Sequence, residues 1–161
     1  DIDRHDSGRV DFEVIWPPKK GPRKGNNSSC VLIVTWKGQS VLLTGDIEKK
    51  AEQTILETGL LKNHKISVLI APHHGSMTSS TSAFVEAVQP GHTVFSSGFR
   101  HHFGHPHPDV VSRYKHNGSE IWSTGDQGAI TFVWQAQGRL SVQGEREKGI
   151  FDCFTCTAWW R

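Results

Sequence analysis

The sequence predicts a mixed α/β fold in which helices cover a sheet. Two β-rich runs, 31–36 and 40–43, are separated by Lys37-Gly38, which is typical of an antiparallel hairpin. Downstream of this hairpin, short apolar runs alternate with amphipathic stretches, which favours strands alternating with helices. The chain has 161 residues, of which 35% are hydrophobic, so it has material for one domain rather than two.

The elements follow in order along the chain. Residues 12–16 are expected to form a strand that ends at Pro17-Pro18, and the Gly/Lys/Asn/Ser-rich segment 19–29 is expected to be a loop. A helix is predicted over residues 47–57, because Ile47, Ala51 and Ile55 share one face and Gly59 follows. Later strands are expected at residues 66–71, 93–97, 121–123, 129–135 and 139–143, with a short helix around 84–88 and another over 108–116. We therefore expect a core at residues 12–135, with tails at 1–11 and 144–161.

Net charge and the lengths of the apolar runs exclude few classes of function. A net charge of +2 is too small to indicate nucleic-acid binding by itself, but Lys19, Lys20, Arg23 and Lys24 crowd one loop. Such a loop can contact phosphates, or it can be an ordinary solvated surface. No apolar run reaches 18 residues, so no membrane span is expected within this stretch.

Three cysteines are present. Cys30 begins an apolar run and is expected to be a buried thiol. Cys153 and Cys156 form a single C-x-x-C, which is expected to be a disulfide or two free thiols rather than a metal site, because structural zinc usually needs four ligands.

Histidine is the unusual residue type. Six of the ten histidines fall in three tight groups, namely His73-His74, His101-His102, and His105 with His107. Imidazole is the commonest protein ligand for zinc and similar ions, so clusters in loops and at strand ends favour a metal site. We expect His101 and His102 to be surface residues.

Asp46 has two competing interpretations. It follows a predicted strand and precedes a predicted helix, so it fits a helix N-cap. A carboxylate in this position can also bridge two metal ions, because it offers two oxygens and is ionised at pH 7. The sequence leaves both roles open.

His73 and His74 follow a predicted buried strand. Because adjacent side chains on an extended chain point to opposite sides, we expect one of the two to bind a metal. The other is expected to support the site or to donate a proton to a leaving group. Ser76 follows this pair and is expected to hydrogen-bond a phosphate. The prolines of His105-Pro106-His107-Pro108 hold that loop rigid, which suits site residues and also a plain loop before a helix.

Four motifs in this order resemble one known family. They are N-N-S-S-C-V-L (26–32), L-L-T-G-D-I-E (42–48), A-P-H-H-G-S-M-T-S-S (71–80) and G-H-P-H-P-D-V (104–110). Together with T-G-D-Q-G-A-I (124–130), they are similar to the C-terminal extracytoplasmic domain of the ComEC family of DNA-internalisation competence proteins. The similarity spans residues 12–132, most of the chain.

The resemblance implies a metallo-β-lactamase-like αββα sandwich with two divalent metal ions, zinc or manganese, and hydrolysis of DNA. It implies that Asp46 bridges the metals, that the His73-His74 pair contains the last histidine ligand, and that His74 or His105 acts on the scissile bond. The expected contacts to DNA are Asn27, Ser76, His107, Lys19 and Lys20. It further implies a periplasmic location on the bacterial inner membrane, within a polypeptide that also carries a membrane channel domain.

One departure from the family pattern is large. The H-x-H-x-D-H run, which supplies most metal ligands in the N-terminal half of this fold, is absent, and His5-Asp6 lacks its spacing. We therefore expect the chain to be only the C-terminal half of the sandwich, with an incomplete ligand set and weak or no activity alone. A half sandwich is also expected to expose an apolar sheet face and to form homodimers.

Two rival interpretations stay open at this point. A phosphodiesterase or phosphorylcholine esterase of the same fold would also carry H-H-G-S after a strand. A metal-free DNA-binding or interaction module would keep the fold and the basic loop.

Overall fold

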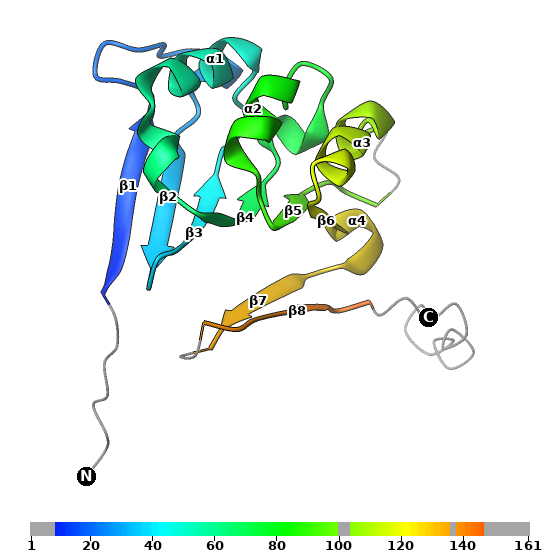
Figure 1. Cartoon of the computed structure of the whole chain (residues 1–161). Coiled ribbons are helices and arrows are strands. Elements are labelled where there is room, and N and C mark those ends of the chain that lie inside the picture. The colour runs from blue at the N-terminus through cyan, green and yellow to red at the C-terminus, as the bar shows by residue number, and fades with distance from the viewer. Residues whose placement is uncertain (1–8, 100–103, 136–137, 147–161) are drawn as a thin grey trace, which may run out of the picture.

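The computed structural model describes residues 9–99, 104–135 and 138–146 (Figure 1). One sheet has the order β1-β2-β3-β4-β5-β6, and a separate two-stranded sheet is formed by β7 and β8. The strands are β1 (Val10–Trp16), β2 (Val31–Trp36), β3 (Gln39–Leu43), β4 (Ile66–Ile70), β5 (His92–Phe95), β6 (Glu120–Ser123), β7 (Ile130–Trp134) and β8 (Leu140–Gly144). The α-helices are α1 (Lys49–Thr58), α2 (Ser82–Val88), α3 (Pro108–His116) and α4 (Thr124–Gln127), and the 3-10 turns are η1 (Asn26–Ser28), η2 (Leu60–Asn63) and η3 (Pro72–Gly75).

The strand pairing changes from antiparallel to parallel along the chain, as the sequence predicts. Strands β1, β2 and β3 pair antiparallel, with Lys37-Gly38 at the turn between β2 and β3. Strands β3 to β6 pair parallel, and their connections contain α1, α2 and α3. The predicted mixed α/β class is therefore confirmed.

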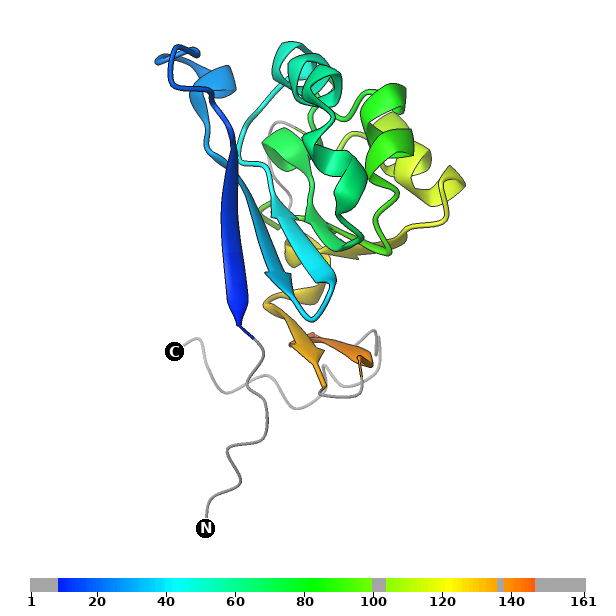
Figure 2. The ribbon, with the colours of Figure 1, turned by 60° about the vertical axis from the view of Figure 1, so that its left-hand side comes forward.

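Helices α1, α2 and α3 lie on one face of the six-stranded sheet (Figure 2). Side chains from alternate strand positions, such as Ile33, Leu42 and Leu69, are fully buried beneath them. Each such side chain contributes about 1.5–3 kcal/mol through its removal from water. The packing of the helices on the sheet fixes the carboxyl ends of β3 and β4, and the site described below lies just past these ends.

The opposite face of the sheet is covered only in part. Phe132 of β7 packs against His92 and Trp122, with ring centroids 5.6 and 6.1 Å apart, so the β7–β8 hairpin covers β5 and β6. Among the described residues, no element covers this face over β1 to β3, and Phe12 and Val14 are 69% and 62% exposed. Cross-strand pairing places Phe12 beside Val34 and Val14 beside Leu32, so the exposed surface is a continuous apolar area.

This open area predicts self-association of the 161-residue chain. Covering Phe12 and Val14 with a second copy would stabilise the pair by about 1.5–3 kcal/mol for each side chain. Sedimentation velocity over a concentration series is expected to detect dimers, and Phe12→Lys is expected to abolish them. Val133→Lys, at a 49% exposed position on the hairpin, is the matched control. A wild-type chain that stays monomeric throughout the series contradicts the prediction.

Several sequence-based boundaries need correction. Helix α1 begins at Lys49 rather than at residue 47, and a short helix, α4, lies between the strands that were expected at residues 121–123 and 129–135. Cys30 is exposed rather than buried, because Val31 is the residue that enters the core and its neighbour points the other way. The predictions for His101-His102 and for Cys153 and Cys156 fall outside the described residues.

Candidate active site

The candidate site is built from turns that follow two neighbouring parallel strands. Asp46 comes from the turn after β3, and His73 and His74 come from η3 after β4. The two turns are joined directly, since the backbone N–H of His73 donates to the carbonyl of Gly45 at 3.0 Å. Gly45 has a φ of +55°, and a Cβ there would lie 2.8 Å from Cβ of Ser29, so a side chain at this position would push the two loops apart.

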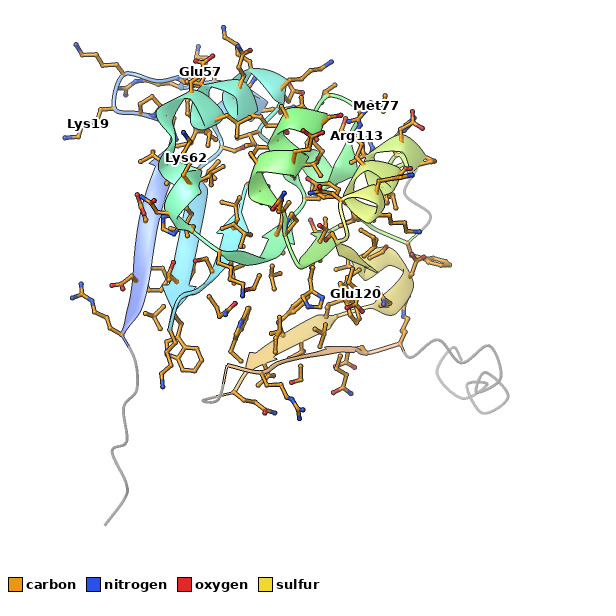
Figure 3. The ribbon with its side chains drawn as sticks, in the orientation of Figure 1. Lys19, Glu57, Lys62, Met77, Arg113 and Glu120 are labelled. Atoms are coloured by element: carbon orange, nitrogen blue, oxygen red, sulfur yellow. The ribbon has the colours of Figure 1, made fainter. Side chains whose placement is uncertain are left out.

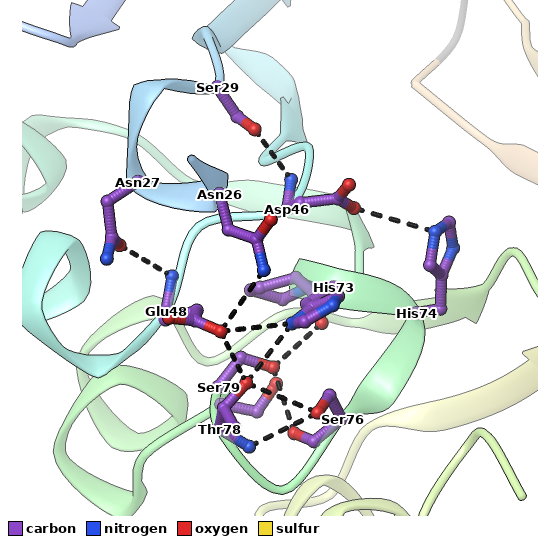
Figure 4. Close-up of polar contacts among 12 residues, drawn as sticks. Asn26, Asn27, Ser29, Asp46, Glu48, His73, His74, Ser76, Thr78 and Ser79 are labelled. Atoms are coloured by element: carbon purple, nitrogen blue, oxygen red, sulfur yellow. Dashed lines mark hydrogen bonds and ion pairs between the residues drawn. The ribbon is translucent and has the colours of Figure 1, made fainter. Parts of the chain in front are cut away.

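Asp46 and His74 face each other across the site (Figure 4). Oδ1 of Asp46 lies 3.5 Å from Nε2 of His74, and both side chains are 45% exposed. Nδ1 of His74 lies 2.7 Å from the carbonyl oxygen of Ser96. Because a carbonyl only accepts, Nδ1 of His74 donates to Ser96, and Nε2 is the ring nitrogen that faces Asp46.

Asp46 does not cap helix α1, so the structure resolves one of the alternatives left open by the sequence. The helix starts three residues later at Lys49, its N-cap residue is Glu48, and no side chain caps it. The backbone N–H of Asp46 donates to Oγ of Ser29 at 3.1 Å, which leaves the carboxylate directed toward His74.

His73 points away from His74, and the ring centroids are 6.4 Å apart. We expected their separation to come from an extended backbone, but both residues are left-handed, with φ of 47° and 54°. Nδ1 of His73 instead lies 3.1 Å from Oγ1 of Thr78 and 3.5 Å from Oε1 of Glu48.

The loop before α3 packs onto η3 through Gly75. The backbone N–H of His107 donates to the carbonyl of Gly75 at 2.9 Å. A Cβ at position 75 would lie 2.6 Å from Phe95 and 2.8 Å from Pro106, so only glycine allows this approach. The ring of His105 consequently lies 6.1 Å from that of His73, at the edge of the site.

His107 and Asn27, two of the predicted substrate contacts, have structural partners. Nδ1 of His107 accepts from the backbone N–H of Asp109 at 3.2 Å and so caps α3. Oδ1 of Asn27 accepts from the backbone N–H of Glu48 at 2.9 Å, which anchors η1 to the start of α1.

The remaining predicted contacts differ in exposure. Ser76 is 6% exposed, and its hydroxyl lies 3.2 Å from Oγ1 of Thr78. Lys19 and Lys20 are exposed in the loop between β1 and β2, and Lys19 extends outward from it (Figure 3). The structure thus brings Asp46, His73, His74 and His105 to one edge of the sheet, with the basic loop on the β1 side.

Several residues of this site were missed by sequence reasoning. Glu48, Thr78 and Ser96 hold the two histidines, and Asn26 and Ser29 hold Glu48 and Asp46. The sequence does carry a sign of these residues, because hydroxyl and amide side chains are concentrated in N-N-S-S (26–29) and S-M-T-S-S (76–80), within the family motifs. Apart from the contact between His73 and Thr78, which spans five positions, their contacts span 17 to 30 positions, and a linear pattern does not give these.

A buried acid lies behind this site. Glu52 of α1 is fully buried and accepts hydrogen bonds from the backbone N–H groups of Ser80 and of Thr81, the latter at 2.9 Å. Burial raises the pKa of Glu52 above its usual value, although the N–H groups of Thr81 and Ser80 act in the opposite direction. Burial also raises the pKa of Tyr114, whose hydroxyl donates to Oγ of Ser80 at 3.0 Å. These contacts fix the loop that carries Ser76 and Thr78.

The Asp46–His74 pair fits two ligands of one divalent ion. With ligand bonds of about 2.1 Å and tetrahedral angles, two donor atoms lie about 3.4 Å apart. The observed 3.5 Å between Oδ1 and Nε2 agrees with this separation. Within residues 9–99, 104–135 and 138–146, no group of three or more His, Cys, Asp or Glu side chains is placed to hold a metal ion.

Comparisons with known proteins agree with the fold and with the motifs. Residues 5–99 match the family described as the metallo-beta-lactamase superfamily. The chain is 36% identical over 138 residues to "Competence protein ComA" of Neisseria gonorrhoeae, which covers 85% of the chain and 19% of that protein. It is 33% identical over 134 residues to "ComE operon protein 3" of Bacillus subtilis, which covers 83% of the chain and 17% of that protein.

"Recombination protein 2" of Haemophilus influenzae is 35% identical over 137 residues, which covers 85% of the chain and 17% of the relative. The chain therefore spans less than a fifth of the length of these relatives. Among the residues that the structure describes, no helix has the length and apolar character needed to cross a membrane.

The resemblance to competence proteins that the four motifs predict is confirmed by these matches. The mixed sheet, the helix layer and the matched segment, which covers more than half of the chain, lead to the same assignment. The chain belongs to the metallo-beta-lactamase superfamily.

Proposed function

We propose that this chain is part of a metal-dependent nuclease that hydrolyses DNA phosphodiester bonds during DNA uptake. The observation that carries the proposal is the facing pair of Asp46 Oδ1 and His74 Nε2, which is held at the spacing of two metal ligands. Superfamily membership and the competence names of the relatives support it. We further propose that it works on the periplasmic side of the inner membrane, within a larger protein that contains a channel domain.

The residues divide into roles on this proposal. Asp46 and His74 would hold a divalent ion, zinc or manganese, and the remaining ligands of the two-metal centre would come from the rest of the polypeptide. Bound ions supply positive charge to phosphate oxygens and activate water. His105 donates a proton to the leaving oxygen, since its ring lies at the edge of the site. Lys19 and Lys20, which are exposed, contact the DNA backbone, and Nδ2 of Asn27 and Nε2 of His107 are the atoms of those side chains left to join them. Ser76, which is buried against Thr78, supports the loop rather than contacting the DNA directly.

His74 is assigned to metal binding rather than to proton donation. Its Nδ1 proton is held by the carbonyl of Ser96, which leaves Nε2 as the ring nitrogen that would coordinate an ion held jointly with Asp46. Metal-binding histidines characteristically hold their second ring nitrogen in this way. The same pattern supports a metal site more than it supports a metal-free DNA-binding module.

The nuclease proposal is tested on the complete domain of the parent protein. Metal-dependent nicking of a supercoiled plasmid that a chelator abolishes is the expected result. Cleavage of phosphorylcholine esters without plasmid nicking would favour the same-fold esterase. Salt-sensitive DNA binding that survives both the chelator and Asp46→Asn, without nicking, would favour the metal-free module.

The 161-residue chain alone is expected to bind metal weakly. Two ligands give much less affinity than the complete set of a zinc centre, and the described residues offer no third protein ligand beside them. Calorimetric titration with Zn²⁺ and with Mn²⁺ measures this directly, with Asp46→Asn as the control for binding at the proposed site. Tight binding of two ions per chain would contradict the proposal that most ligands lie elsewhere in the polypeptide.

A further inference from the structure

Glu48 connects three loops around the site (Figure 4). Its Oε1 accepts from Oγ1 of Thr78 at 2.9 Å and from Nδ2 of Asn26 at 3.2 Å, and it lies 3.5 Å from Nδ1 of His73. Its backbone N–H donates to Oδ1 of Asn27 at 2.9 Å. One carboxylate thus contacts η1, η3 and the segment after η3.

The directions of these hydrogen bonds follow from the chemistry of the groups. A carboxylate only accepts, so the hydroxyl of Thr78 donates its proton to Glu48. Oγ1 of Thr78 then has lone pairs but no proton to offer to His73, which lies 3.1 Å away. Nδ1 of His73 must therefore be the donor in that contact, and the series runs from His73 through Thr78 to Glu48.

We propose that Glu48 is a positioning residue that keeps the proton of neutral His73 on Nδ1, by fixing the direction of the Thr78 hydroxyl. His73 then presents Nε2 as an acceptor, which makes it a metal ligand or a proton acceptor rather than a proton donor. That consequence for His73 rests on the proposed nuclease function. The hydrogen-bond role of Glu48 stands on the contacts alone.

His74 provides an internal reference for this proposal. Its Nδ1 proton is held by the backbone carbonyl of Ser96, 2.7 Å away, and no contact in this arrangement depends on Glu48. If the loss of Glu48 only loosened the whole site, the tautomers of both His73 and His74 would change. If the loss of Glu48 acts by releasing the Thr78 hydroxyl, only the tautomer of His73 changes.

Two substitutions of similar size separate these cases. Glu48→Gln keeps an acceptor oxygen for the Thr78 hydroxyl, whereas Glu48→Met keeps the length of the side chain but removes the acceptor. Long-range ¹H–¹⁵N correlation spectra of the ¹⁵N-labelled chain, recorded over a pH series so that the neutral form of each imidazole is observed, give the tautomer of each histidine. The wild type and Glu48→Gln are expected to hold His73 in the Nδ1–H form. In Glu48→Met the population of the Nδ1–H form of His73 is expected to fall several-fold. The tautomer of His74 is expected to be the same in all three proteins.

The proposal is overturned if Glu48→Met leaves the tautomer of His73 unchanged, or if His74 changes as much as His73. In the complete domain, Glu48→Met is expected to lower kcat for plasmid nicking by about 10-fold or more, as for other groups that orient a site histidine, and Glu48→Gln is expected to restore it. A wild-type domain that nicks no DNA would contradict the proposed function and not the tautomer result, which is read on the metal-free chain.

Discussion

Replacing Asp46 by asparagine in the complete domain is expected to lower the rate of DNA hydrolysis by about 1000-fold, equivalent to about 4 kcal/mol of transition-state stabilisation. Asparagine has nearly the same shape, so the backbone contact from residue 46 to Oγ of Ser29 stays in place. What is lost is the negative charge opposite Nε2 of His74, 3.5 Å away. A neutral amide is a poor ligand for a divalent ion that must also hold a phosphate, and plasmid nicking at saturating metal measures the loss.

The matched control is Asp126→Asn, at an exposed position in α4 outside the site. It removes the same charge and is expected to leave the nicking rate close to that of the wild type. Equal rates for Asp46→Asn and Asp126→Asn would show that Asp46 takes no part in catalysis. A thermal unfolding curve for each variant establishes that the comparison is between folded proteins.

The largest expected effect on stability comes from Glu52→Ala. The substitution removes the acceptors of two backbone N–H groups, that of buried Ser80 and that of partly buried Thr81, and each group left unpaired costs about 1–3 kcal/mol. Together with the cavity that remains, the expected loss in the free energy of unfolding is about 3–5 kcal/mol. Urea unfolding followed by tryptophan fluorescence measures it.

Glu57→Ala on the same helix is the control, because Glu57 is exposed and its carboxylate accepts a hydrogen bond from the exposed side chain of Gln53. Surface changes of this kind usually stay within about 0.5 kcal/mol. A loss for Glu52→Ala that is no larger than for Glu57→Ala would contradict the structural role of Glu52. The comparison needs no metal and no DNA.

The pH dependence of this effect has a defined sign. Burial raises the pKa of Glu52 in the folded chain above 4.5, the usual value for the side chain. Over the range between the two pKa values the folded state binds more protons than the unfolded state, so the contribution of Glu52 to stability falls as pH rises. The difference in unfolding free energy between the wild type and Glu52→Ala should therefore decrease from pH 4 upward and then level off.

The fold could be predicted because the sequence patterns that specify it lie within each strand, turn and helix. Alternation and turn residues gave β2 with its exact limits, and proline and apolar spacing did the same for α3. The start of α1 was misplaced because Ile47 is fully buried and continues the apolar spacing, although it lies before the helix. The spacing of apolar residues reports burial, and burial extends beyond a helix terminus.

The candidate site was predictable only in part. Motifs identified Asp46 and His74, but which histidine faces the carboxylate depends on two left-handed residues and on the carbonyl of Ser96, 22 positions away. No local pattern reports such a contact. Glu48 was missed for a related reason, since its partners Asn26 and Thr78 lie 22 and 30 positions from it.

The left-handed backbone of His73 and His74 has a consequence for how this protein can evolve. Each non-glycine residue held in this region costs about 1–3 kcal/mol, in a domain whose whole stability is about 5–15 kcal/mol. Glycine would adopt the same backbone without that strain. Glycine at either position is therefore expected to raise the stability of the fold while removing an imidazole, so on the proposed function the two histidines trade stability for metal and proton chemistry.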